Sequence, residues 1–409
     1  MHEGRSFLLN LLREEQEEEK INRLRGRSEN EWQALLEIAE QHIMTPLLFQ
    51  RLRPYFPGPH IPDHYQALMR RSYFQLAAFN MRLYHQLEEL MQKFSDAAVP
   101  VILLKGAHLA MFVYGNISIR PMEDIDLLVK EVDFKKAHSL LIESGYSSSG
   151  EIAWPNNLPT YFQTGKVHID MHSKLKGLPL PGRFDINELW ARAEKVTLGA
   201  TEALTLCPED LLLHVCLHTG IQHGFENGLI SCIDTGYILK HYEGRLDWEQ
   251  LWSRAREWGI DRAVYLMLAL TAKISGLPLP EQAKAFAPAY NHCQEALAEA
   301  EKLIFELQLD VADHVATLFK HQSFQKKLGL LSQRITTPAN INSNGRQEKP
   351  VKASFKRFCS YLSRSRLLFE RHGKTIWRGL LRDPQTTAAI KAQNRRNNLR
   401  EWLRGAEER

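Results

Sequence analysis

Apolar side chains recur every three or four residues in the first part of the chain. From His64 to Phe94 this spacing places one apolar face along a long helix. Two shorter apolar patches precede that stretch. Their members are Leu8, Leu9, Leu11 and Leu12 in the first patch and Trp32, Leu35, Leu36 and Ile38 in the second. The pattern predicts a helical N-terminal region over residues 1–96.

The period changes after residue 96, where short apolar runs rich in β-branched residues predict strands of a buried sheet. The predicted strands are residues 99–104, 124–129, 160–163 and 167–172. The last two surround Thr164-Gly165-Lys166, which predicts a hairpin. A short helix is predicted over 107–114. Asp133 and Gly145 are placed to cap a second helix over 134–143.

The helical period returns at residue 205 and continues to about 335. The predicted helices there are residues 208–223, 229–241, 248–258, 261–275 and 292–307. A polar segment with Pro, Asn and Gly, residues 336–350, predicts a linker. The fold class is therefore α+β: a small mixed sheet over residues 97–204, flanked by N-terminal and C-terminal helical segments and ending in a helical tail over 351–409.

The composition is that of a globular protein, with 44% hydrophobic and 24% charged residues among 409. No apolar run approaches the roughly 18 residues that cross a bilayer, and the first residues lack the layout of a signal peptide. The five cysteines form no C-x-x-C pair, which argues against a disulfide scaffold, a zinc ribbon or an iron–sulfur site. We expect a cytoplasmic protein.

Positive charge is concentrated at the C-terminal end of the sequence. Residues 351–409 hold 15 Lys and Arg against 5 Asp and Glu, a net +10, so the other 350 residues carry −6. Aromatic residues lie between these arginines, as they do in surfaces that bind RNA or anionic membranes. The more common arrangement is a basic helix that packs on an acidic body, and we rank it first.

Two acidic residues interrupt the apolar strand at 124–129. Strand alternation points Asp124 and Asp126 to one side, with Ile125 and Leu127 on the other. Two neighbouring carboxylates repel each other, and near a core both need a compensating cation. Mg²⁺, or Mn²⁺ in its place, prefers such oxygen ligands. An isolated D-x-D is weak evidence, because it also occurs at solvated strand ends.

Positive charge and a glycine lie close to this motif in the sequence. The strand at 99–104 leads into Lys105 and Gly106, and a glycine at such a turn lets a ligand approach the backbone. Lys105 and Arg120 could both serve a phosphate. The alternatives are a surface charge for Lys105 and, for Arg120, an ion pair with Glu123 or Asp124.

A third acid follows on the strand at 167–172. His168, Asp170 and His172 alternate with apolar residues and therefore share one face. If this strand lies beside residues 124–129, Asp170 completes a cluster of three carboxylates.

These motifs together resemble the DNA-polymerase-β-like nucleotidyltransferase superfamily. The exact residues of the motifs resemble its uncharacterised bacterial nucleotidyltransferase family. The segments that carry the resemblance are Leu-Lys-Gly-Ala-x-Leu at 104–109, Arg-x-x-x-Asp-Ile-Asp-Leu-Leu-Val at 120–129, Ile-Asp-Met-His at 169–172, and the helical segments 212–218 and 233–237. The likeness covers about residues 60–280. It identifies residues 97–204 as the nucleotidyltransferase core.

The resemblance implies a metal-dependent transfer of NMP from a nucleoside triphosphate, such as ATP, to a hydroxyl group with release of pyrophosphate. Asp124, Asp126 and Asp170 would bind Mg²⁺, and Asp170 would also activate the acceptor hydroxyl. Gly106 and Ala107 would bind the β- and γ-phosphates. Lys105 or Arg120 would assist them. The expected acceptor is a small molecule, a sugar or a peptide derivative.

One departure from the superfamily leaves other functions open. The phosphate turn usually reads Gly-Ser or Gly-Gly, whereas this chain has Gly106-Ala107 and so lacks a hydroxyl contact. A catalytically degenerate nucleotide-binding or interaction module is therefore one alternative. The long spacing from Gly106 to Asp124 also occurs in abortive-infection toxins that add nucleotides to transfer RNA. In that alternative the basic tail would bind the RNA.

Several histidines are further candidates. His214 and His218 lie four residues apart on one helix face, with Asp234 further on, a spacing that can bind a metal. Over a metal site, we favour the alternative that these three are polar residues that line the cleft beside the catalytic core. Together with His168 and His172 they are candidates for contact with the acceptor. His108 is expected in the core, and the loop at 154–159 could help to bind the acceptor.

Overall fold

The computed structural model describes residues 2–13, 17–56, 58–149, 159–179, 184–226, 228–285, 293–305 and 384–405. The predicted linker, most of the basic tail and nearly all of the loop at 154–159 lie outside these residues. The chain divides into two compact units, residues 1–304 and 305–409. In the second unit the described element is a helix, α18 (Pro384–Leu403).

The N-terminal region is helical, as its apolar period predicted. The helices are α1 (His2–Leu12), α2 (Glu17–Leu24), α3 (Glu29–Gln41), α4 (Thr45–Leu52) and α5 (Asp63–Asp96). Trp32 forms the centre of this group: it is fully buried, and its ring lies 5.3 Å from that of Phe7 and 6.1 Å from that of Tyr65. A reciprocal capping box between Ser28 and Glu31 begins α3.

The middle of the chain folds into a seven-stranded mixed sheet, so the predicted α+β class is confirmed. Its strands are β1 (Val101–Leu103), β2 (Asp124–Val129), β3 (Ser147–Ser148), β4 (Thr160–Phe162), β5 (His168–His172), β6 (Glu194–Leu198) and β7 (Thr201–Thr205). The strand order is β3-β4-β5-β2-β1-β7-β6. Within it, β2 runs parallel to β5 and antiparallel to β1, and β4 and β5 form the predicted hairpin.

The sheet is larger than the sequence predicted, because β3 and the hairpin of β6 and β7 were missed. The strand β6 is mostly exposed and reads Glu-Lys-Val-Thr-Leu, which lacks the apolar run used to find the other strands. It forms an edge of the sheet and pairs with β7 across a turn at Gly199, whose φ is +59°.

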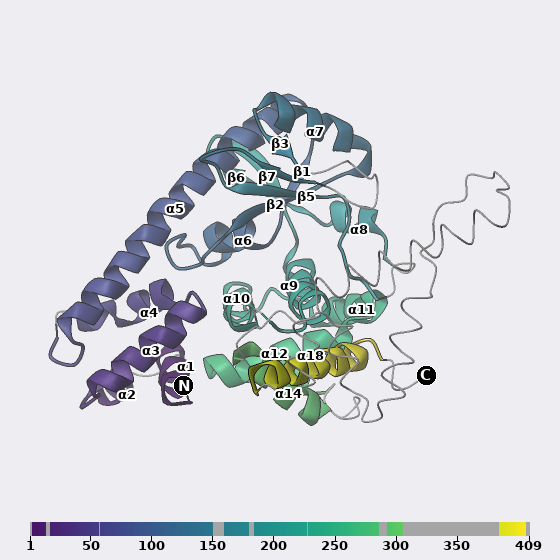
Figure 1. Cartoon of the computed structure of the whole chain (residues 1–409). Coiled ribbons are helices and arrows are strands. Elements are labelled where there is room, and N and C mark those ends of the chain that lie inside the picture. Colours follow the sequence, from purple (N-terminus) through teal and green to yellow (C-terminus); the bar gives the residue numbers. More distant parts are fainter. Residues whose placement is uncertain are drawn as a thin grey trace, which may run out of the picture. The chain divides into compact units, whose positions relative to one another are not determined.

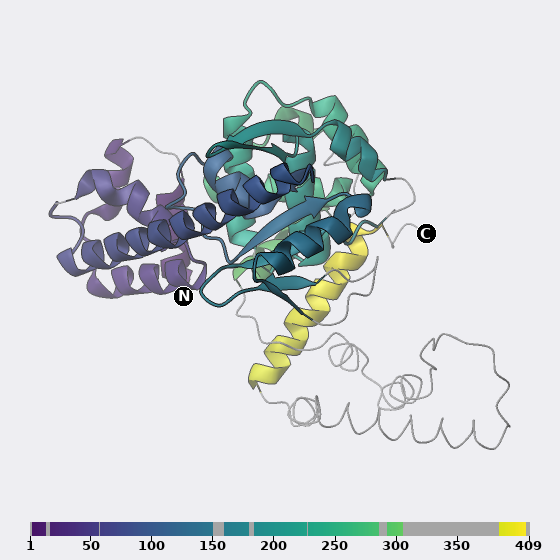
Figure 2. The same ribbon diagram turned by 90° about the horizontal axis from the view of Figure 1, so that it is seen from above.

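Two helices cover one face of the sheet. Apolar residues of α5 and of α7 (Phe134–Glu143) share a core with Ile125, Leu127 and Ile169, the inward-facing residues of β2 and β5. Figure 1 shows α5 and α7 above the sheet, with α6 (Lys105–His108) and α9 (Pro208–Cys216) below it. Seen from above in Figure 2, α5 runs from the N-terminal helices to the sheet. The opposite face is therefore left for the acidic side chains of β2 and β5.

Helices also follow the sheet, as predicted. They are α9, η5 (a π-helix, Leu217–Gln222), α10 (Gly228–His241), α11 (Trp248–Trp258), α12 (Asp261–Ser275) and α14 (Cys293–Phe305). Two short helices were not predicted: α8 (Ile186–Ala191), between β5 and β6, and α13 (Glu281–Lys284). Left-handed glycines end two of them, Gly259 after α11 and Gly276 after α12. Among the described residues no helix combines the length and the apolar character that a membrane span requires.

Candidate active site

Three carboxylates meet where β2 and β5 run side by side. Asp126 is paired in register with Asp170 on the neighbouring strand, and Asp124 lies one pleat away on the same face. One oxygen from each of the three lies within 4.8 Å of the others. The cluster that strand alternation predicted is therefore present.

The two acids of β2 have opposite electrostatic surroundings. Burial, together with the charge of Asp126, raises the pKa of Asp124 to about 6 from an ordinary 3.8, although Lys105 opposes the shift. Burial also acts to raise the pKa of Asp126. There the hydrogen bond with His172 and the charge of Lys105 outweigh burial and hold the pKa well below its usual range. The charge on Asp126 is compensated, whereas that on Asp124 is not.

The residues present fit a divalent cation. Lys105 Nζ and His172 Nε2 both lie 2.8 Å from the same oxygen of Asp126, its Oδ1. Asp170 Oδ1 is buried without a hydrogen-bond partner. Three carboxylates with one lysine leave an excess of negative charge, and carboxylate oxygens are the ligands that Mg²⁺ and Mn²⁺ prefer. A cation at this place would remove both the repulsion and the unsatisfied oxygen.

Lys105 takes an unusual backbone conformation. Its φ is +43°, in the left-handed region, at the point where β1 turns into α6. Such strain in a residue other than glycine is frequent at functional sites. In this conformation the Lys105 ammonium group, just after β1, lies against Asp126 on the neighbouring strand β2.

Gly106 is required by packing. A Cβ at this position would lie 2.5 Å from Arg120 Nη1 and 2.8 Å from Met122 Cγ. Both Gly106 and the following Ala107 are buried. The turn is thus close-packed against the segment that precedes β2, and its binding of phosphate stays a prediction.

Arg120 pairs with an acid that the sequence did not suggest for it. Its Nη2 lies 2.9 Å from Asp234 Oδ2, and its Nε donates to Asp234 Oδ1. Tyr114 donates its hydroxyl to the same Oδ1 at 2.7 Å, and Asn80 holds the Arg120 carbonyl. The alternative weighed for Arg120 was an ion pair with Glu123 or Asp124; the ion pair is present, but with Asp234. A role for Arg120 at a phosphate would require it to leave Asp234.

The four candidate histidines differ in their surroundings. His172 contacts Asp126, whereas His168 is exposed and is paired in register with Asp124. His214 on α9 is buried, and burial together with the charge of Lys105 holds its pKa well below the usual range. The same two causes lower the pKa of His218 on η5 to about 3.

No group of metal-ligating side chains other than the three aspartates occurs in the described part of the chain, so His214, His218 and Asp234 do not form a metal site there. His108 is buried, as expected, and burial lowers its pKa to about 3.

The sequence was compared with protein families and with known proteins. Residues 28–276, more than half of the chain, match the model of a family described as "uncharacterised nucleotidyltransferase". The chain belongs to this family. No curated protein matches the sequence.

Two solved structures resemble this chain weakly. The antibiotic-resistance factor ANT(2'')-Ia has 9% identity and a TM-score of 0.32, over 42% of this chain and 90% of its own. An antigenic nucleotidyltransferase-like protein from Paracoccidioides brasiliensis has 14% identity and a TM-score of 0.30, over 47% of this chain and 93% of its own. These similarities are too weak to bear on the activity of this chain.

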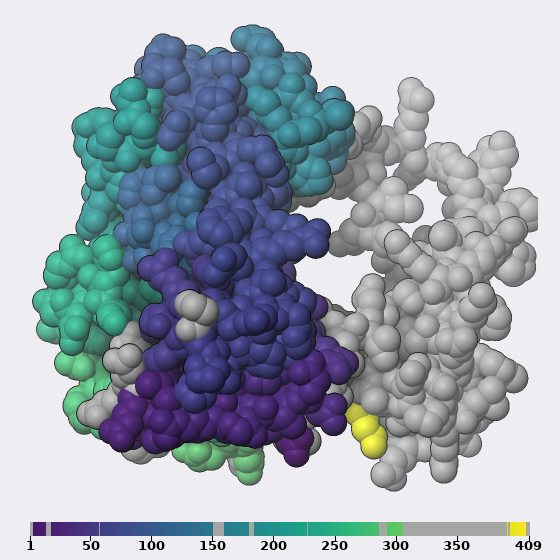
Figure 3. Space-filling model, turned by 90° about the vertical axis from the view of Figure 1, so that its left-hand side faces the viewer, coloured from purple at the N-terminus to yellow at the C-terminus, as the bar shows by residue number. Residues whose placement is uncertain are grey.

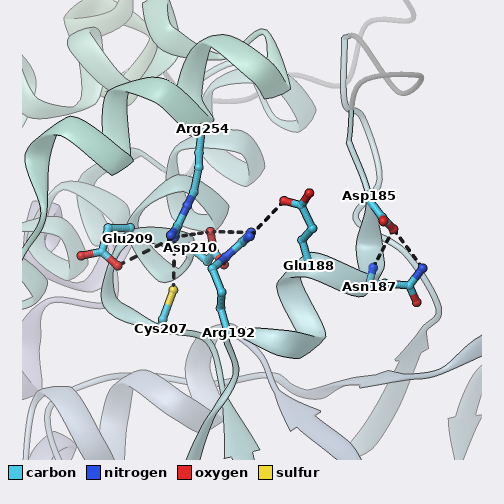
Figure 4. Close-up of polar contacts among 8 residues, drawn as sticks. All are labelled: Asp185, Asn187, Glu188, Arg192, Cys207, Glu209, Asp210 and Arg254. Atoms are coloured by element: carbon cyan, nitrogen blue, oxygen red, sulfur yellow. Dashed lines mark hydrogen bonds and ion pairs between the residues drawn. The ribbon is translucent and has the colours of Figure 1, made fainter.

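A second acidic group in the same unit of the chain has a different composition. Asp210, at the start of α9, is fully buried between two arginines: Arg192 Nε lies 2.9 Å from its Oδ2 and Arg254 Nη1 lies 3.1 Å from its Oδ1. Figure 4 shows Cys207 and Glu209 on the far side of Arg254 and Glu188 beyond Arg192. Burial raises the pKa of the Cys207 thiol to about 12, so this thiol stays protonated at neutral pH.

Of the side chains that surround the beginning of β2 and β5, sequence reasoning singled out His168 and missed the others. A cavity of about 630 Å³ lies there, between the middle of α5, Glu123 and the turn from β4 to β5. The apolar period of α5 identified its buried face only. The exposed face, with Arg82 and His85, gave no signal because isolated surface charges are common.

Proposed function

We propose that the protein transfers NMP from a nucleoside triphosphate to a hydroxyl-bearing acceptor and releases pyrophosphate. One observation carries the proposal: Asp124, Asp126 and Asp170 converge within 4.8 Å with more negative charge than Lys105 compensates. Membership of the nucleotidyltransferase family supports the same class of reaction.

The three carboxylates would hold one or two Mg²⁺ ions, which would neutralise charge on the triphosphate and on the departing pyrophosphate. Lys105 and His172 fix the orientation of Asp126, because both contact its Oδ1 and leave Oδ2 for another ligand. Asp170 would bind the ion through its unpartnered Oδ1, and its other carboxylate oxygen is the proposed acceptor of the hydroxyl proton.

The bonds in the proposed reaction balance without a further reactant. The acceptor oxygen forms a bond to the α-phosphorus, and the bond from that phosphorus to the α–β bridging oxygen breaks. Its electron pair leaves with pyrophosphate, and the hydroxyl proton passes to Asp170. The backbone amides of Gly106 and Ala107 would bind the β- and γ-phosphates, assisted by Lys105. Arg120 would assist only after release from Asp234.

The test is a transfer assay with each α-labelled nucleoside triphosphate, Mg²⁺ or Mn²⁺, and a cell extract as the source of acceptor. We expect label in an extract fraction and equimolar pyrophosphate, both lost in Asp124→Asn. Glu131→Gln, at an exposed site just beyond β2, is the matched control and should retain both. Release of pyrophosphate without metal, or by Asp124→Asn at the parent rate, would overturn the proposal.

The two alternatives gain no support from the described residues. Transfer to transfer RNA was inferred from the superfamily and the tail at 351–409, most of which lies outside them. A degenerate module would have no need of a buried, unpartnered oxygen on Asp170.

A further inference from the structure

The helix that runs from α9 into η5 crosses the face of the sheet that carries the three aspartates. It begins shortly after β7, and near its end Gln222 Nε2 donates to the Lys176 carbonyl at 2.7 Å, in the segment that follows β5. In the sheet, β1 and β2 lie between β7 and β5. Figure 1 shows α9 below the sheet with α6, and these two helices contact each other. The helix therefore forms a wall of the candidate active site.

Two histidines of this wall lie within electrostatic reach of the aspartates. His214 and His218 are one turn apart, and the charges of Lys105 and Asp126 act on the pKa of both. Burial and the charge of Lys105 outweigh that of Asp126 and lower both pKa values, so the two rings are neutral at pH 7. A neutral imidazole has one N–H donor and one nitrogen that accepts.

The hydrogen bonds of His218 determine which of its nitrogens accepts. The Lys176 carbonyl can only accept, so Gln222 turns its amide nitrogen to that carbonyl and its Oε1 to the ring. His218 Nδ1, 3.0 Å from this Oε1, is therefore the nitrogen that carries the proton and donates. Nε2 keeps a lone pair, and it has no hydrogen-bond partner among the described residues.

A second nitrogen of the wall also lacks a partner. His214 is 3% exposed, and its Nδ1 is buried without a hydrogen bond to any described residue. Buried polar atoms without a partner are rare in folded proteins, and many of them meet a ligand or an ordered water. In addition, η5 is a π-helix, a distortion that is frequent at functional sites. These observations point to a ligand at this wall.

The lone pair of His218 Nε2 restricts the chemistry of that ligand. Phosphate oxygens are hydrogen-bond acceptors, so a triphosphate would be repelled by this nitrogen. Mg²⁺ prefers oxygen ligands, and His218 is not part of the metal-ligating group formed by the three aspartates. The group that meets Nε2 must therefore donate an O–H or an N–H.

In the proposed function, the reacting hydroxyl gives its proton to Asp170 and has none left for His218. The donor must then be a second group. The acceptor is favoured over the nucleotide as its source, because Gln222 ties η5 to the segment after β5, the strand of Asp170. The triphosphate, in contrast, is proposed to bind at the turn after β1.

We propose that His218 Nε2 accepts a hydrogen bond from the acceptor, which carries a second O–H or N–H group beside the hydroxyl that receives NMP. The proposal rests on the proposed function, since it describes the acceptor of that reaction. Gln222 is a positioning residue, because it holds the tautomer of His218.

Two substitutions of His218 separate binding from a structural role. Asn places a donor near Nδ1 and nothing at Nε2, whereas Gln places an oxygen near Nε2 and loses the contact with Gln222. The assay uses full-length protein, labelled nucleoside triphosphate, Mn²⁺ and the extract fraction that takes up label. His218→Asn should raise the amount of this fraction that gives half the maximal rate roughly tenfold, and His218→Gln less than about threefold. The dissociation constant of the nucleotide should change less than about twofold in both variants.

Two other histidines supply matched controls. His138 Nδ1 also has a hydrogen-bond partner, the Tyr161 hydroxyl at 2.7 Å, but it belongs to α7 on the other face of the sheet. His85 belongs to α5, which is exposed along the side of the molecule shown in Figure 3. His138→Asn and His85→Asn should leave the half-saturating amount of the fraction unchanged.

The tautomer can be tested without any substrate. Nitrogen-15 NMR of the histidine-labelled, metal-free protein at pH 7 should show His218 with a protonated Nδ1 and an unprotonated Nε2. The signals are assigned by their loss in His218→Asn. Gln222→Leu should remove the preference for this tautomer and raise the half-saturating amount of the fraction.

The outcomes separate the two proposals. A protonated Nε2, a larger effect of Gln than of Asn at position 218, no effect of either, or a loss of nucleotide affinity instead of acceptor affinity would overturn the role of His218. Those results would leave the transferase activity intact, because the parent still labels the fraction. Absence of label and pyrophosphate from the parent would instead overturn the proposed function and the role of His218 with it.

Discussion

Buried and half-buried acids occur in two kinds of surroundings in this protein. Asp234 and Asp210 are buried against arginines, at 2.9 Å from Arg120 and 2.9 Å from Arg192, and every charge in these groups has a close counter-charge. Asp126 is buried between the half-buried Asp124 and Asp170, and the one lysine paired with this cluster is Lys105, on Asp126. Both kinds lie in the same unit of the chain.

The difference separates acids that stabilise the fold from acids whose charge a bound ligand would compensate. An uncompensated buried carboxylate is costly, and folded proteins retain one mainly where a function requires it. Asp210 and Asp234 stabilise contacts between distant segments. Asp124, whose charge is not compensated, destabilises the free protein, and a cation would offset that cost. The comparison therefore predicts opposite effects on stability of the same substitution at Asp124 and at Asp210.

The largest expected effect is on activity. Asp124→Asn should lower transfer roughly a thousandfold, because it removes a ligand of the ion that stabilises the transition state. The folded state should be as stable as the parent or more so, since the repulsion with Asp126 is relieved. Labelled-nucleotide transfer and urea unfolding, measured together, check both the activity and the stability of this variant.

Asp126→Asn should also abolish transfer. Unlike Asp124→Asn, it should destabilise the folded state, because Lys105 and His172 are then left without a charged partner. Equal destabilisation of the two variants would contradict the comparison.

The compensated acids should respond in the opposite way. Asp210→Asn leaves Arg192 and Arg254 facing each other and should destabilise the fold by about 3 kcal/mol, as expected when one partner of a buried pair is removed. Transfer measured well below the melting temperature should be retained. Glu188→Gln is the control. That carboxylate pairs with Arg192 at 3.1 Å but is 57% exposed, so its loss should change stability by less than about 1 kcal/mol. A loss of activity without a loss of stability in Asp210→Asn would assign Asp210 to the site.

The two kinds of acid also differed in how far the sequence predicted them. Asp124, Asp126 and Asp170 could be assigned to one face because strand alternation is a local rule, and a parallel pair of strands then brought them together. The partner of Arg120 could not be predicted. Asp234 lies 114 residues further along the chain, and only the packing of α10 beside the sheet brings it near.

The same limit explains the missed strands and the missed cavity. The edge strand β6 is mostly exposed and carries charged side chains, and its neighbour β7 reads Thr-Glu-Ala-Leu-Thr, so no apolar run marks either strand. The wall of the cavity combines single residues from α5, from Glu123 and from the turn before β5, which no local pattern connects. Sequence reasoning predicted what one segment determines and missed what several segments build together.

A divalent metal should stabilise the folded protein by binding to Asp124, Asp126 and Asp170, and not by binding at Asp210 or Asp234. Mn²⁺ at a hundred times its dissociation constant should raise the free energy of unfolding by about 2–3 kcal/mol, because the ion binds the folded state alone. Asp170→Asn should abolish most of this gain, since the oxygen it replaces is buried and unpartnered. Asp210→Asn should be less stable than the parent without metal, but Mn²⁺ should raise its free energy of unfolding by the same amount as in the parent. Thermal unfolding with EDTA and with Mn²⁺ gives the measurement, and an equal shift in the parent and in Asp170→Asn would mean that the ion binds elsewhere.

The smallest expected effect is the dependence of stability on pH in the metal-free protein. The pKa of Asp124 is raised to about 6, so between pH 6 and its ordinary 3.8 the folded state binds a proton that the unfolded state releases. Acidification through that window therefore favours folding at this residue, and the gain is lost as the pH rises back through the window to about 6. At pH 7 the parent should be about 1–2 kcal/mol less stable than Asp124→Asn, and the gap should close by pH 4. The buried histidines have lowered pKa values and destabilise both proteins on acidification, so the difference between the two urea unfolding curves cancels their effect. A gap that stays constant or widens as the pH falls would mean that the charge of Asp124 is compensated, and the contrast with Asp210 would disappear.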